Sequence, residues 1–176
     1  MFMQMVSRYT QFLPLVAFLW TARYFGFNDT GWMYAFYAGS IIAIIQSAIF
    51  AFYKIFFNRF LLAINLFLLG GGVAFLTHSK ILLNLYSDYQ QVMLFVAFII
   101  VGVVTTFFTK AGFVGVENSS PVKTRRFSLY LLGASVLGLG AALVFKNYGI
   151  LSAAVILIIL RFLNEYFEKS LKNAKN

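Results

Sequence analysis

Six long apolar runs, separated by short polar segments, make up most of the chain. A helix of about 20 residues, rising 1.5 Å per residue, crosses a hydrocarbon layer about 30 Å thick. The runs lack the short alternating segments that a membrane barrel would show. The pattern therefore predicts an all-α, polytopic transmembrane helix bundle. The six predicted spans lie near 9–27, 32–53, 60–78, 91–109, 127–146 and 149–167.

The segments between the runs differ in character. "FNDTGW" (27–32) and "KNYG" (146–149) are typical of tight turns, because Asn, Asp and Gly favour them. "SKILLNLYSDYQ" (79–90) is expected to lie partly along the membrane interface. Residues 110–126 form the one substantial polar loop in this interpretation. We expect a single integral membrane domain over 1–176 that ends in a basic cytoplasmic tail at 168–176.

The composition agrees with a membrane protein. Hydrophobic residues make up 61% of the chain and charged residues 11%, whereas about a quarter of a soluble domain is charged. The chain has no Cys, which excludes disulfides, thiolate metal sites and thiol catalysis. A re-entrant first segment, leaving five true spans, stays open as an alternative because Pro14, Trp20 and Arg23 crowd that run.

The charge is strongly basic, with 14 Lys and Arg against 5 acids and a net charge of +9. In a bundle of six spans with both termini in the cytoplasm, three cations lie outside and the other eleven inside, as the positive-inside rule requires. Nucleic-acid binding is not expected, because no basic face carries base-reading or stacking groups. The outer cations are Arg23, Lys80 and Lys146; the inner ones are Arg8, Lys54, Arg59, Lys110, Lys123, Arg125, Arg126, Arg161, Lys169, Lys172 and Lys175.

Small residues recur at every fourth position of the second run, and on a helix they form one narrow ridge. Lipid gives helices no hydrophobic reason to associate, so close contact through small residues does this work. The ridge predicts helix packing within the chain, or a dimer interface. Its members are Gly31, Ala35, Gly39, Ala43, Ser47 and Ala51, with Ala134, Gly138 and Ala142 repeating the spacing in the fifth run.

Three consecutive glycines, Gly70 to Gly72, lie inside the third run. They predict either a very close helix crossing or a broken helix that lines a substrate path. His78 ends the same run and is expected to be an interfacial residue. With only Asp29 and Asp88 on the outer side, it makes a weak metal constellation.

Polar residues within the spans are few, and no acid lies mid-span. A proton- or sodium-coupled pump would usually show an intramembrane Asp or Glu. No nucleophile with a base, phosphate loop or pair of carboxylates can be assembled. We therefore expect no catalytic residues, no cofactor and no bound metal. The intramembrane polar residues are Gln46, Asn65, Thr105, Thr106, Ser135 and Ser152.

Three short stretches carry a resemblance to a known family: "FLPLVAF" (12–18), "GGVAFLTH" (71–78) and "FKNYG" (145–149). In order and spacing they are similar to motifs of the intracellular septation protein A, or YciB, family of bacterial inner-membrane proteins. The chain departs from the family pattern at "ILLNLY" (81–86) and "VKTRRFS" (122–128). The motif positions are Phe12, Leu13, Pro14, Gly71, Gly72, His78, Phe145, Lys146 and Gly149.

The resemblance implies a non-enzymatic, multi-pass protein of the inner membrane that supports envelope integrity and septation. It would act through helix-mediated association with other membrane proteins of the envelope or division machinery, with a homo-oligomer also possible. One alternative is a small transporter or passive channel, with Gly70 to Gly72, Gln46, Asn65 and Thr105 along its path. Another is an accessory membrane subunit of a secretion or respiratory complex.

Overall fold

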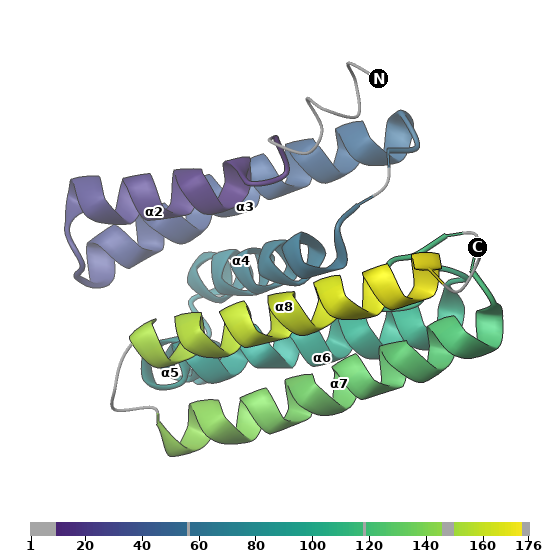
Figure 1. Ribbon diagram of the computed structural model, residues 1–176. Helices are drawn as coiled ribbons and strands as arrows, with labels where there is room; N and C mark the ends of the chain where they lie inside the picture. The colour runs from purple at the N-terminus through teal and green to yellow at the C-terminus, as the bar shows by residue number, and fades with distance from the viewer. Residues whose placement is uncertain (1–9, 56, 118, 146–149, 174–176) are drawn as a thin grey trace. The chain divides into compact units, whose positions relative to one another are not determined.

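The computed structural model describes residues 10–55, 57–117, 119–145 and 150–173, with side chains from 155 onward in the last range. Within these ranges every regular element is a helix, which confirms the predicted all-α class (Figure 1). The helices are α2 (Leu13–Phe25), α3 (Asp29–Phe52), α4 (Arg59–Thr77), α5 (Lys80–Asp88), α6 (Gln90–Phe108), α7 (Pro121–Val144) and α8 (Ile150–Asn173).

Four of these helices, α3, α4, α6 and α7, are long and apolar enough to cross a bilayer, so the chain is a membrane protein. Helix α2 is apolar but has 13 residues, fewer than a full crossing needs. The predicted sixth span begins at 149, outside the described residues. The count of six spans therefore stays a prediction.

Two helices extend beyond the predicted spans. Helix α7 begins at Pro121, six residues before the predicted 127, because proline suits the first turn of a helix. The predicted tail is helical as far as Asn173, since α8 continues through it. On α8, Glu165 pairs with Arg161 at 3.2 Å and Glu168 with Lys172 at 3.3 Å, each four residues apart. Such pairs support an exposed helix.

The chain divides into two compact units, unit 1 up to Asp88 and unit 2 from Tyr89. In unit 1, α2 and α3 form an antiparallel hairpin (Figure 1). Its turn contains Gly26 at φ 88°, a left-handed conformation that favours glycine. Asn28 then caps α3, accepting a hydrogen bond of 2.8 Å from the amide of Gly31. This hairpin places α3 between α2 and α4.

In unit 2, α7 packs against both α6 and α8. The connection from α6 to α7 is shorter than the predicted polar loop of 110–126, because α7 begins at Pro121. Its first half is folded inward, with Ala111, Phe113 and Val114 buried. The Ser128 hydroxyl accepts hydrogen bonds from the amides of Phe113 (2.9 Å) and Val114 (3.3 Å). The connection thus buries these apolar residues and is held to α7 through Ser128.

Each unit has a glycine at the crossing of its three longer helices. A Cβ on Gly39 of α3 would lie 3.2 Å from Phe18 of α2 and 3.3 Å from Leu68 of α4. A Cβ on Gly138 of α7 would lie 3.4 Å from Phe95 of α6 and 2.9 Å from Ile156 of α8. In both units a glycine on the middle helix lets an aromatic residue and an aliphatic residue approach the backbone.

Candidate functional site: filled and open glycines

The three glycines of α4 accept three different side chains. The helix is continuous from Arg59 to Thr77, so the broken-helix alternative is wrong for this structure. A Cβ on Gly70 would meet the Tyr86 hydroxyl, one on Gly71 the Phe36 ring and one on Gly72 the Ser40 hydroxyl. The glycines therefore permit close packing of α3 and α5 on α4.

Phe36 is the centre of this packing and is 1% exposed. Its ring centroid lies 5.0 Å from that of Phe18, 5.5 Å from Phe67 and 5.4 Å from Tyr86. The Tyr86 hydroxyl donates a 3.0 Å hydrogen bond to the carbonyl of Phe67. Burial raises the pKa of Tyr86 to about 12, because the phenolate would lose its solvation. The surrounding rings leave Phe36 little room to move.

The intramembrane polar residues of unit 1 join helices to one another. The Gln46 amide donates to the carbonyl of Thr10, and its oxygen accepts a 3.2 Å bond from Asn65. The Ser40 hydroxyl donates a 2.8 Å bond to the carbonyl of Leu68. In unit 2, Thr105 bonds to the carbonyl of Val101 within its own helix, at 2.6 Å. Residues predicted to line a solute path are thus held in packing contacts.

The predicted small-residue ridge packs only along part of its length. Gly31, Ala35, Gly39 and Ala43 are buried, whereas Ser47 is half-buried and Ala51 exposed. A step of four residues turns the ridge by about 40° around the helix, so it rotates away from its neighbours. The buried face continues instead through Gln46 and Phe50. On α7, Gly138 and Ala142 are buried and Ala134 is half-buried.

The motif positions are divided between interior and surface. His78 is exposed at the C-cap of α4 in a left-handed conformation, φ 49°. Gly71, Gly72 and Pro14 are buried, whereas Phe12, Leu13 and Phe145 are exposed; Lys146 and Gly149 lie outside the described residues. In the described part of the chain, no three residues among His, Asp and Glu are close enough to hold a metal ion.

One side of α7 carries two glycines without a close neighbour among the described residues. A Cβ on Gly133 or Gly140 would have none of these residues within 4 Å. Val136 and Leu137 lie between them, and Leu137 is 76% exposed. We call this surface, with Val144 one turn further on, the open glycine face. A spacing of four does not reveal this face, because its glycines are seven residues apart.

Comparison with known proteins adds no relative: no family model, curated protein or solved structure matches the chain. The class of protein therefore follows from the helices themselves. It is an all-α membrane protein in which Ser40, Gln46 and Asn65 of α3 and α4 form hydrogen bonds between helices. Glycines of α3, α4 and α7 lie against side chains of neighbouring helices.

Proposed function

We propose that the chain is a non-enzymatic, multi-pass protein of the bacterial inner membrane that supports envelope integrity and septation. It does so by helix-mediated association with membrane proteins of the envelope or division machinery. The resemblance to the septation protein A family supports a role in envelope integrity and septation. The observation that supports the association is the open glycine face of α7, where Gly133 and Gly140 have no close neighbour in the described part of the chain.

The spacing of these glycines suits a partner helix. Residues seven apart lie about 20° from each other around a helix, so Gly133 and Gly140 share one side. Two gaps about 10 Å apart, with Leu137 projecting between them, are suited to a left-handed helix crossing. The glycines at the crossings inside each unit, Gly39 and Gly138, are filled by the chain's own side chains. The proposed partner surface is therefore α7 rather than the ridge of α3.

The proposed topology has six spans, with both termini in the cytoplasm. The eleven-to-three distribution of cations supports this orientation. In it α7 enters from the cytoplasmic side, and α5 lies at the outer interface. The exposed Ile81 of α5, 76% accessible, is placed to contact lipid there.

Two alternatives have weaker support. A passive channel would need Gln46, Asn65 and Thr105 to face a path, but all three are in hydrogen bonds within or between helices. An accessory subunit of a secretion or respiratory complex would use the same α7 face. The identity of the bound partner distinguishes that role from septation.

The test is crosslinking in native membranes with a photoreactive amino acid at position 137. We expect crosslinks to division or envelope-synthesis proteins, lost when Gly140→Leu fills the face. Ala48→Leu, at an exposed position of α3, is the matched control and should keep them. A crosslink to a second copy of the chain would indicate a homo-oligomer in place of an envelope partner. Crosslinks unaffected by Gly140→Leu would refute the proposed face.

A further inference from the structure

Three helix ends come together at one end of unit 2. The rings of Phe127 in α7 and Phe167 in α8 lie 4.9 Å apart, which brings the start of α7 beside the end of α8. The Arg125 guanidinium lies 5.0 Å from the centroid of the Phe107 ring, near the end of α6. We call this region the basic end, because the exposed cations Lys110, Lys123, Arg125, Arg126, Lys169 and Lys172 lie on these segments.

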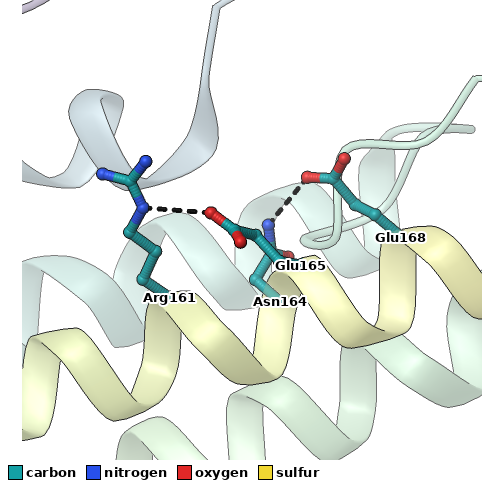
Figure 2. Close-up of polar contacts among 4 residues, drawn as sticks. All are labelled: Arg161, Asn164, Glu165 and Glu168. Carbon is teal, nitrogen blue, oxygen red and sulfur yellow. Dashed lines mark hydrogen bonds and ion pairs between the residues drawn. The ribbon is translucent and has the colours of Figure 1, made fainter.

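The cations of α7 differ from those of α8 in their partners. On α8, Arg161 and Lys172 are neutralised by Glu165 and Glu168 (Figure 2 shows the Arg161 pair and the bond from Asn164 to Glu168). Of the ion pairs formed by the described residues, none involves Lys123, Arg125 or Arg126 of α7. These three positive charges lie within about one helical turn, and no described carboxylate forms an ion pair with them.

Aromatic rings hold the two arginines in place. The Arg126 Nε donates a 2.8 Å hydrogen bond to the Tyr130 hydroxyl, and its guanidinium lies 5.6 Å from that ring's centroid. Arg125 lies over Phe107, which is 51% exposed. Stacking on a ring leaves the Nη donors of a guanidinium available for a phosphate.

The depth of the two arginines in the bilayer also favours a headgroup ligand. The exposed apolar surface of α6 and α7, including Phe107 and Leu129, belongs among acyl chains. The guanidinium groups next to it then lie where headgroup phosphates are found. The start of α7 adds the positive end of a helix dipole at the same level.

From these observations we propose that Lys123, Arg125 and Arg126 bind the phosphate of an anionic phospholipid headgroup, such as phosphatidylglycerol. The proposed lipid site uses residues at the start of α7 that precede the open glycine face, with Arg126 seven residues before Gly133 and on the same side of the helix. The inference does not depend on the proposed association. Cations that serve only to orient the protein in the membrane would not need side chains held in a fixed geometry. The contacts to Phe107 and Tyr130 distinguish a lipid site from a general charge bias.

Native mass spectrometry of the full chain in neutral detergent tests the proposal, with phosphatidylglycerol and phosphatidylcholine of identical acyl chains as probes. We expect phosphatidylglycerol to bind more tightly and to stay bound in excess inorganic phosphate. The double variant Arg125→Gln, Arg126→Gln should bind it about thirtyfold less tightly, from about 1 kcal/mol per cation. The control Arg161→Gln removes a cation already paired with Glu165 and should change binding less than twofold.

Two results would overturn the lipid site: equal affinity for the two lipids, or an equal loss of binding in the control. Displacement by inorganic phosphate would contradict a lipid ligand and indicate a free anion. If the double variant does not fold, the single variant Arg126→Gln serves instead, with an expected loss of about fivefold. The conservative Arg126→Lys keeps the charge but removes the planar fork, so an unchanged affinity would also refute the proposed geometry.

Discussion

The substitution Gly71→Ala should destabilise the chain, although alanine is the better helix former. The added methyl would lie inside van der Waals contact with three carbons of the Phe36 ring. That ring has little room to shift, because it is 1% exposed and packs 5.0 Å from the ring of Phe18. Overpacking of this kind costs about 1–3 kcal/mol.

A matched substitution isolates the cost of overpacking at Gly71. Gly140→Ala places the same methyl in open space on α7. Both variants gain the helix propensity of alanine, about 1 kcal/mol, so the propensity cancels in their comparison. The free energy of unfolding of Gly71→Ala should therefore lie about 1–3 kcal/mol below that of Gly140→Ala. Gly70→Ala should lie between them, because only the end of the Tyr86 side chain must move.

The assay is reversible unfolding in mixed detergent micelles, followed by far-ultraviolet circular dichroism. A double-mutant cycle checks the cause. Phe36→Leu should relieve the clash, so combining it with Gly71→Ala should recover at least about 1 kcal/mol of unfolding free energy. Equal stabilities of Gly71→Ala and Gly140→Ala would refute the reasoning. So would a double-mutant cycle with no coupling between Gly71 and Phe36.

Two further predictions concern single polar groups. Ser128→Ala should lower the free energy of unfolding by about 1–3 kcal/mol, because the amides of Phe113 and Val114 lose their acceptor. Thr106→Val should leave it unchanged or raise it by up to about 1 kcal/mol, since that buried hydroxyl has no partner in the described structure; a large loss would contradict this. Because the pKa of Tyr86 rises from 10.0 to about 12 on folding, its contribution to stability is complete below pH 10 and is lost as the pH rises toward 12. Each pH unit in that window costs up to about 1.4 kcal/mol for this one proton, and pH-dependent unfolding should show this component missing in Tyr86→Phe.

Hydrophobic length predicts the positions of three long helices closely. The ends of α3, α4 and α6 lie within three residues of the predicted runs, because a bilayer crossing fixes the length of an apolar helix. Hydrophobic length does not predict the start of α7, since the segment from Pro121 to Arg126 is polar and proline is also common in loops. Nor does it predict the burial of Phe113, which depends on a bond to Ser128, fifteen residues away.

The packing partners of the glycines cannot be predicted from the sequence. A run of three glycines predicts close packing, but not that Phe36 and Tyr86 fill two of the gaps. These partners come from other helices, and their arrangement depends on tertiary structure. Gly138 and Gly140 are two residues apart on one helix, yet one is filled and one is open. Only the rotation of α7 relative to α6 and α8 decides between them.

Whether α7 contacts an envelope partner through its open glycine face is tested most directly by the photocrosslinker at position 137 in living cells. The account predicts crosslinks to a division or envelope-synthesis protein in the otherwise wild-type chain and in Ala48→Leu, and their loss in Gly140→Leu at unchanged protein level. Crosslinks to lipid alone, or the same protein partners in all three chains, would contradict it.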